Sequence, residues 1–120
     1  MSHRGTEDTF LQTLFPDDMN GLRVIDVGHG YGKTGWWLRT VIGMSHGWCE
    51  LYGIDIFPKY HALASKLGYY DELLLQDARE PWNFPSGFFD ISIAQHVIEH
   101  SEKEQAYNLI KQMEKTLVAE

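Results

Sequence analysis

The sequence is poor in the features that mark secreted, membrane-spanning and nucleic-acid-binding proteins. It has one cysteine, Cys49, among 120 residues, so no disulfide can form within the chain and a reducing compartment is favoured. It contains no run of 18 or more apolar residues, and its polar start lacks the apolar core of a signal peptide. Ten basic against seventeen acidic residues give a net charge of −7, which offers no general attraction for phosphate backbones.

These shortages favour a cytoplasmic protein that has neither a membrane nor a nucleic acid as its partner. The residues that are present suit a globular fold, because 43% are hydrophobic and 13% are aromatic. A chain of this length is enough for one domain with one modest core. We therefore expect residues 1–120 to form a single domain, with an N-terminal helix and lead-in over 1–20 and the core over 21–120.

Apolar runs alternate along the chain with segments of helical spacing. Strands are predicted over 22–27, 50–56, 72–76 and 89–95. Helices are predicted over 6–15, 33–44 and 58–67, and a fourth begins at a capping box that starts with Ser101. Such alternation is typical of βαβ units, which give an α/β fold with a parallel sheet and helices on both faces. Ligands of such folds lie beyond the carboxyl ends of the strands.

A glycine loop follows the first predicted strand. Gly28, Gly30 and Gly32 alternate with other residues directly after Asp26 and Val27, and glycine allows tight turns and close approach to a ligand. The dinucleotide pattern G-x-G-x-x-G would need a glycine where Lys33 stands. The phosphate-loop pattern is nearly met at Gly32-Lys33-Thr34, but Val27 occupies the place of its first glycine, so a P-loop nucleotide-binding protein stays open as an alternative.

Two more strand ends carry a carboxylate. Asp55 ends the second strand, where it can accept hydrogen bonds from a ribose diol, or else serve as the N-cap of the next helix. Asp77 follows the third strand, where it can accept from an adenine amino group, or else open a turn. The acids at these two strand ends, beside the glycine loop, are consistent with a nucleoside ligand.

At four strand ends, in order and spacing, the sequence resembles the class I S-adenosylmethionine-dependent methyltransferases, which are Rossmann-like, doubly wound folds. Residues 24–32 look like the family's first motif, an acidic residue ahead of G-x-G-x-G. Residues 84–90 and 95–100 are similar to the segments before and after the family's fourth strand, the latter common in the small-molecule branch.

The resemblance implies S-adenosylmethionine as cofactor and S-adenosylhomocysteine as product. Asp26 would hold the amino group through water, the glycines would lie beneath the methionine part, and Asp55 would hold the ribose. The full set of implied cofactor-binding residues is Asp26, Gly28, His29, Gly30, Gly32, Asp55, Ile56, Asp77, Ala78, Gln95 and His96. No catalytic residue is implied.

The sequence departs from the family pattern in two places. His29 stands where a small residue or cysteine is common, and the chain stops at Glu120, where the family continues into strands five to seven. We therefore expect a sheet truncated to about four strands, in the order 3-2-1-4. Strand four would then be an exposed edge, which predicts a homodimer or another association through it.

Two functional hypotheses remain at this point, beside the P-loop alternative. The first is a methyltransferase that acts on an unidentified, small-molecule acceptor. The second is a non-catalytic module that binds the cofactor or only keeps the fold. His96, Glu99 and His100 also spell the zinc-protease pattern H-x-x-E-H, but that motif needs a helix and a further ligand, so we expect no metal.

Overall fold

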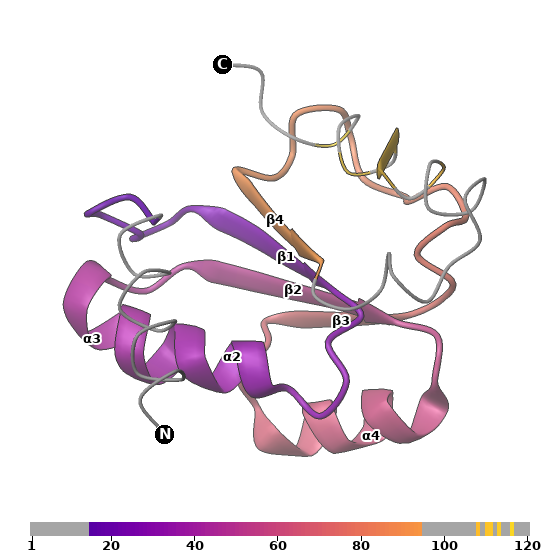
Figure 1. Cartoon of the computed structure of the whole chain (residues 1–120), viewed down its shortest axis with the longest axis horizontal. Helices are drawn as coiled ribbons and strands as arrows, with labels where there is room; N and C mark the ends of the chain where they lie inside the picture. The colour runs from indigo at the N-terminus through magenta and orange to yellow at the C-terminus, as the bar shows by residue number, and fades with distance from the viewer. Residues whose placement is uncertain (1–14, 95–107, 109, 112, 114–115, 117–120) are drawn as a thin grey trace, which may run out of the picture.

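The computed structural model describes residues 15–94 together with residues 108, 110, 111, 113 and 116 (Figure 1). Its elements in chain order are β1 (Arg23–Val27), α2 (Lys33–Trp37), the π-helix η1 (Leu38–Ile42), α3 (Gly43–His46), β2 (Glu50–Asp55), α4 (Pro58–Leu67), β3 (Glu72–Leu75) and β4 (Ile91–Ala94). The four predicted strands are confirmed to within two residues at each end. The predicted helix over 6–15, apart from its last residue, and the capping box at Ser101 lie outside the described residues.

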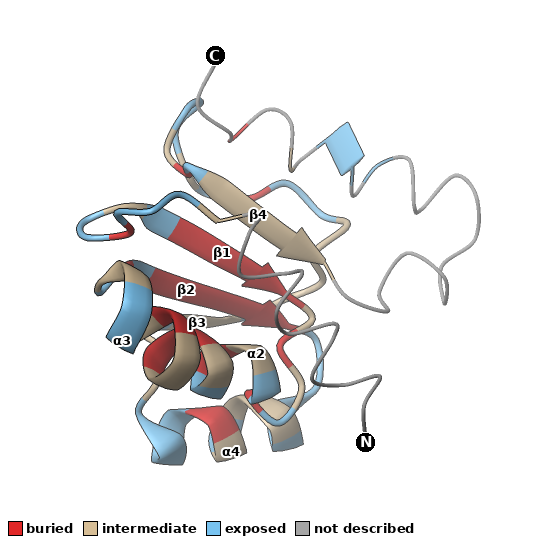
Figure 2. Ribbon diagram, turned by 60° about the vertical axis from the view of Figure 1, so that its left-hand side comes forward, coloured by how far each residue is buried: buried red, intermediate tan, exposed pale blue. Residues whose placement is uncertain are grey.

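The four strands form one parallel sheet in the order β3-β2-β1-β4, as predicted. The helical segment from α2 to α3 and helix α4 lie on the same side of this sheet (Figures 1 and 2), which right-handed crossovers from β1 to β2 and from β2 to β3 require. The register pairs Asp26 with Gly53, and Val27 with Ile54. The carboxyl ends of β1 and β2 therefore lie side by side. None of the helices in the described part of the chain is long and apolar enough to cross a membrane.

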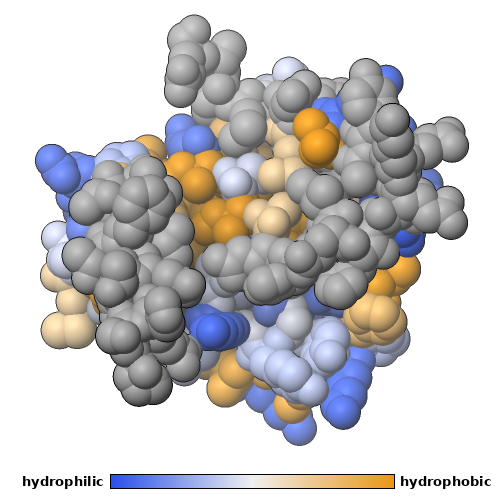
Figure 3. All heavy atoms as spheres, viewed as in Figure 1, coloured by the Kyte–Doolittle hydropathy of each residue, from blue (hydrophilic) through white to orange (hydrophobic). Residues whose placement is uncertain are grey.

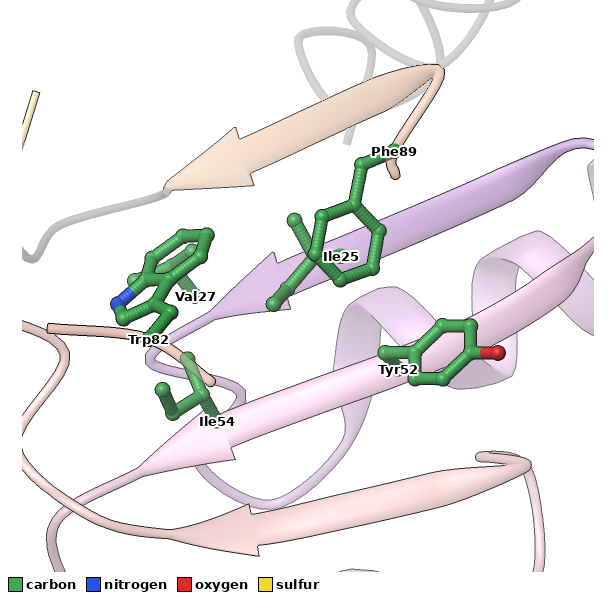
Figure 4. Close-up of a cluster of buried hydrophobic side chains, with 6 residues drawn as sticks. All are labelled: Ile25, Val27, Tyr52, Ile54, Trp82 and Phe89. Atoms are coloured by element: carbon green, nitrogen blue, oxygen red, sulfur yellow. The ribbon is translucent and has the colours of Figure 1, made fainter. Parts of the chain in front are cut away.

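The central strands β1 and β2 are buried on both faces, whereas β3 and β4 are only partly buried (Figure 2). On one face, Ile25, Val27, Tyr52 and Ile54 point from the two strands toward Trp82 and Phe89 (Figure 4). Partly buried apolar side chains from the segment before β4 and the helical Met113 pack against this cluster. The helical face carries the second cluster, of Met19, Val24, Leu38, Ile42, Cys49 and Leu51.

The predicted helix over 33–44 is longer than expected and contains a π-helical turn, η1, in its middle. A π-helical turn inserts one residue and rotates the following residues around the helix axis. Here the turn buries Arg39 beside Leu38 and Ile42. The Arg39 guanidinium donates to the carbonyl oxygens of Tyr69 (2.8 Å) and Cys49 (2.5 Å), and to the carboxylate of Asp71 (2.9 Å). The prediction from α-helical spacing therefore did not find Arg39, a buried cation that holds this helix to the start of β2 and to the turn before β3.

Candidate functional site

The glycine loop joins β1 to α2 at the carboxyl edge of the sheet. Gly28, Gly30 and Gly32 have φ angles of 74°, 55° and 90°, in the left-handed region where residues with a Cβ are strained. A Cβ built on Gly30 would meet no atom within 4 Å, so the loop is open on that side. The glycines therefore serve the backbone path of the loop, and the space beside Gly30 is free.

Asp55 fastens this loop to the end of β2. The amide of Gly30 donates to Oδ2 of Asp55 at 3.0 Å, and the amide of Phe57 donates to Oδ1 at 3.0 Å. The N-cap of α4 is Phe57 and no side chain caps that helix among the described residues, so the alternative role of Asp55 as a helix cap is wrong. Because a carboxylate offers about four lone-pair directions, each oxygen keeps one for a ligand.

Asp26 is the most deeply buried carboxyl group of the site, with 2% of its surface exposed. The Tyr70 hydroxyl donates to its Oδ2 at 2.5 Å, and the amide of Gly35 donates to that hydroxyl oxygen at 3.2 Å. The pKa of Asp26 is raised to about 7, because burial and the negative charge of Asp55 raise it by more than the hydrogen bond from Tyr70 lowers it. This buried acid has no cationic partner among the described residues.

His29 turns inward from the loop and is 5% exposed. Its Nδ1 lies 2.9 Å from the carbonyl oxygen of Gly30, and its ring lies 5.4 Å from that of Tyr70. Burial lowers the pKa of His29, which favours the neutral ring. A carbonyl oxygen can only accept, so Nδ1 carries the proton, and Nε2 is a buried acceptor that has no partner in the described structure. Because the His29 side chain is buried, only its backbone is available to a ligand at the glycine loop.

The end of β3 contributes Asp77 and Ala78. Asp77 opens a turn, because its carbonyl oxygen accepts from the amide of Glu80 at 3.0 Å, and its carboxylate accepts two hydrogen bonds of 2.8 Å from the Arg79 guanidinium. The Arg79 side chain holds the pKa of Asp77 below its usual value. Ala78 packs against the cluster around Ile25, and its carbonyl oxygen accepts from the Trp82 indole. Asp77 therefore opens a turn, as one of its two predicted roles required, and its carboxylate is paired with the Arg79 guanidinium.

The structure brings together the predicted residues of the first two strand ends, namely Asp26, the loop from Gly28 to Gly32, and Asp55 with the half-exposed Ile56. Gln95 and His96 lie outside the described residues, as does the H-x-x-E-H segment. In the described ranges, no three His, Cys, Asp or Glu side chains are grouped as metal ligands.

Sequence reasoning missed Tyr70 and Arg79, which hold the two carboxylates Asp26 and Asp77. Tyr70 is separated from Asp26 by 44 residues, and it stands in a turn whose residues carry no recognisable pattern. Its role depends on tertiary contact alone. Arg79 follows Asp77 by two residues, and that short spacing is a signal that could have been used.

Three comparisons place this geometry among known proteins. A family model described as a methyltransferase domain matches residues 25–118. No curated protein matches the sequence. Many solved structures match it, and the chain spans 56%, 48% and 26% of the length of the three whose names follow.

A TehB-like S-adenosylmethionine-dependent methyltransferase from Corynebacterium glutamicum is 16% identical, with a TM-score of 0.70 over 94% of this chain and 56% of that one. An S-adenosylmethionine-dependent methyltransferase from Mesorhizobium loti is 23% identical, with a TM-score of 0.70 over 92% and 48%. The phosphoethanolamine N-methyltransferase 2 of Haemonchus contortus, in complex with S-adenosylmethionine, is 19% identical, with a TM-score of 0.73 over 94% and 26%. At these identities the solved structures establish the Rossmann-like methyltransferase fold, while the match of the family model over most of the sequence shows that the chain belongs to the methyltransferase domain family.

Proposed function

We propose that this chain is the cofactor-binding part of an S-adenosylmethionine-dependent methyltransferase. The observation that carries the proposal is the pair of acids at the ends of β1 and β2. Asp26 is a buried carboxyl group with no cationic partner in the described part of the chain, and Asp55 keeps a free lone pair on each oxygen beside the open side of the glycine loop. A ligand that has an ammonium group at one end and a vicinal diol further along matches both.

The residues of the chain fit this cofactor one by one. Asp55 would accept from the two ribose hydroxyls, while Ile56, 46% exposed, would offer apolar surface beside them. The glycines at 28, 30 and 32 and the backbone of His29 would lie beneath the methionine part, with Asp26 toward its amino group. Asp77 and Ala78 would lie beside adenine. Oδ1 of Asp77 accepts from both the amide and Nε of Arg79, so Oδ2, which accepts one bond from that guanidinium, would offer its remaining lone pair. Gln95 and His96 complete the proposed set.

When bound, the cofactor supplies an electrophilic methyl group on a sulfonium sulfur. The contribution of the described residues is to orient that cofactor, because an in-line displacement depends chiefly on alignment. None of the described acids is placed as a general base in this proposal, and we assign no catalytic residue.

Three observations support a small-molecule acceptor. The net charge of −7 gives no general attraction for nucleic acid. Cys49, the one cysteine, is buried at the amino end of β2, away from the glycine loop, and burial raises the pKa of its thiol, so it is poorly suited to methylation through a thiolate adduct. The phosphoethanolamine methyltransferase among the similar folds acts on a small amine. The single buried cysteine also suits a cytoplasmic location.

Isothermal titration calorimetry with S-adenosylmethionine, S-adenosylhomocysteine and ATP–Mg²⁺ tests the cofactor. We expect both adenosyl ligands to bind, and Asp55→Ala to weaken them at least tenfold, since two hydrogen bonds to a charged acceptor are lost. The matched control is Asp17→Ala, an exposed carboxylate before β1, which should leave affinity unchanged. Binding of ATP alone, or equal affinity of Asp55→Ala and the wild type, would overturn the proposal.

Methyl transfer from labelled S-adenosylmethionine to a panel of small amines, hydroxyls and carboxylates separates an enzyme from a module that only binds the cofactor. The chain covers about half of its structural neighbours, so the panel should be run on the longest natural form as well. Transfer by neither form, with tight cofactor binding by both, would favour the non-catalytic module.

We also propose that β4 associates with a second copy of the chain or with another strand. In the described sheet β4 pairs with β1 along one edge and has no strand along the other. Figure 3 shows apolar atoms at the surface in the region where Figure 1 places β4, whose residues are partly exposed. Analytical ultracentrifugation should show a dimer as concentration rises, with slow amide exchange in β4. A monomer at high concentration with rapidly exchanging β4 amides would contradict this.

A further inference from the structure

Tyr70 lies in the turn between α4 and β3, and it reaches over β2 to the first strand end. Its ring packs 5.4 Å from that of His29, and its hydroxyl contacts Asp26 of β1. Asp26 and Gly53 are direct neighbours in the register of β1 and β2. Tyr70 therefore crosses β2 at Gly53, where the strand has no side chain to obstruct the ring.

Two glycines form the slot that receives this ring. A Cβ on Gly35 would lie 2.6 Å from Cε1 and 2.7 Å from Cζ of Tyr70. A Cβ on Gly53 would lie 3.0 Å from Cδ2 of the same ring. Real Cβ atoms do not approach another atom to less than 3.0 Å, so position 35 must lack a side chain for Tyr70 to sit where it does, and a Cβ at position 53 would make an unusually tight contact with the ring. The slot is built for an aromatic ring at position 70.

The hydroxyl of Tyr70 is held in one orientation. It accepts from the Gly35 amide at 3.2 Å, which directs its own proton to Oδ2 of Asp26 at 2.5 Å. Burial and the neighbouring Asp26 raise the pKa of Tyr70 far above its ordinary value. The phenol therefore stays protonated at every working pH and is a permanent donor to the carboxyl group.

Several titratable groups face this pair from the surrounding elements. Asp55 at the end of β2 opposes the negative charge on Asp26, and Arg39 of η1 acts on Tyr70 from the helical side. His29 of the loop, whose ring contacts Tyr70, is faced by His61 of α4. Among them, Tyr70 is the group that donates a hydrogen bond to Asp26.

We propose that Tyr70 is a positioning residue, which sets the pH range over which Asp26 can hold the amino group of S-adenosylmethionine. The inference rests on the proposed function. An ammonium group is attracted by the carboxylate and not by the neutral acid, so affinity should fall as pH drops below the pKa of Asp26 in the free protein.

The Tyr70 hydroxyl favours the ionised form because it donates to it. A hydrogen bond to a charged group is strong enough that its loss should raise the midpoint of Asp26 by about one to two pH units. In Tyr70→Phe, burial and Asp55 would still oppose ionisation, and nothing described would replace the donor. The variant should therefore need a higher pH for full affinity.

The test is the ratio of dissociation constants for S-adenosylmethionine, Tyr70→Phe over wild type, measured by calorimetry from pH 5.5 to 9. The ligand's own amino group titrates identically in both arms and cancels in the ratio. We expect a ratio near one at the alkaline end, which rises as pH falls and levels at roughly 10 to 100, the fold-change that one to two pH units imply. A purely structural role would give the same ratio at every pH.

Two controls separate the hydroxyl from its surroundings. Tyr69→Phe removes the neighbouring phenol, for which no side-chain contact is described, and its ratio should stay near one. With 5′-methylthioadenosine, which has the nucleoside but lacks the amino-acid tail, the Tyr70→Phe ratio should not change with pH. In an Asp26→Asn background, Tyr70→Phe should also lose its pH-dependent effect.

If Tyr70→Phe does not fold, 3-fluorotyrosine at position 70 keeps the ring and makes the hydroxyl a stronger donor. The midpoint for S-adenosylmethionine binding should then move to lower pH. A pH-independent ratio for Tyr70→Phe, or an unmoved midpoint with fluorotyrosine, overturns the inference while S-adenosylmethionine binding itself stands. A folded wild type that binds no S-adenosylmethionine at any pH overturns the proposed function as well.

Discussion

The Gly30 amide donates to Oδ2 of Asp55 at 3.0 Å, which joins the glycine loop of β1 to the end of β2. One acid thus has two tasks, since it shapes the loop and, in the proposed function, holds the ribose. Loss of the acid should therefore be felt in the fold of the free protein as well as in ligand affinity.

Asp55→Ala should lower the free energy of unfolding of the ligand-free protein by about 2–4 kcal/mol. The amides of Gly30 and Phe57 both lose a charged acceptor, and each partly buried donor left without a partner costs about 1–3 kcal/mol. Asp55→Asn keeps one oxygen and should lose about half as much. Urea denaturation at pH 7 gives both values, and equal stability of the three proteins would show that Asp55 does not secure the loop.

Two glycine substitutions should destabilise the protein for different reasons, one by overpacking and the other by backbone strain. Gly53→Ala places a Cβ 2.7 Å from Leu73 and 3.0 Å from both His29 and Tyr70, so overpacking should cost about 1–3 kcal/mol. Gly68→Ala meets no atom within 4 Å, but its φ of +73° should cost about 1 kcal/mol.

These two variants also differ in their expected effect on the site. Gly53→Ala displaces the ring of Tyr70 and should weaken S-adenosylmethionine, whereas Gly68→Ala, at the end of α4, should not. Thermal unfolding and calorimetry on the same samples measure both quantities. Tight binding by a fully stable Gly53→Ala protein would contradict the slot described for Tyr70.

Arg39→Met should destabilise the protein by about 2–4 kcal/mol. The substitution keeps an unbranched apolar stem but leaves the carbonyl oxygens of Tyr69 and Cys49 without their donor. The Asp71 side chain is half exposed, so water can replace the guanidinium there and the ion pair itself contributes less. Lys66→Met, at an exposed position of α4, is the control and should change stability by less than about 0.5 kcal/mol. If Arg39→Met changed stability as little as Lys66→Met does, the buried guanidinium would not be needed to hold the helix.

The stability of the protein should fall between pH 4 and pH 7 through Asp26. Its folded pKa of about 7 exceeds the ordinary 3.8, so in that window the folded state binds more protons than the unfolded state, and rising pH favours unfolding. The loss of unfolding free energy from ionising this buried acid is absent below pH 4 and complete above pH 7, and it amounts to about 2–4 kcal/mol in all. Asp26→Asn removes this titration, so its stability relative to wild type should increase by that amount from pH 4 to pH 8. Urea denaturation across the range gives the difference, and a constant offset would refute it.

The one-dimensional pattern was sufficient for the sheet and for the acids at its edge. The β-branched and apolar runs predicted β1 and β2 closely, because strands buried on both faces must be apolar throughout. Pro58 and Gly68 predicted both ends of α4, since one suits the first helical turn and the other ends it in a left-handed conformation. Parallel strands bring their carboxyl ends to one edge, so Asp26 and Asp55 could be placed near each other without coordinates.

The π-helical turn and the buried Arg39 could not be predicted in this way. Helical periodicity assumes 3.6 residues per turn, and the insertion is favoured here by acceptors on Cys49, Tyr69 and Asp71, which come from later segments of the chain. The inward turn of His29 likewise depends on the space left by Gly53, 24 residues further on.

The sequence by itself determined the order of strands and helices, the loop of left-handed glycines, and which acids stand at the carboxyl edge, because these follow from local conformation and from the geometry of parallel sheets. Tertiary structure alone decided how those acids are held: Asp55 by the Gly30 amide and Asp26 by the hydroxyl of Tyr70. The physical reason is that a carboxyl group's charge depends on burial and on the donors around it, and those donors come from segments that only the folded chain brings together.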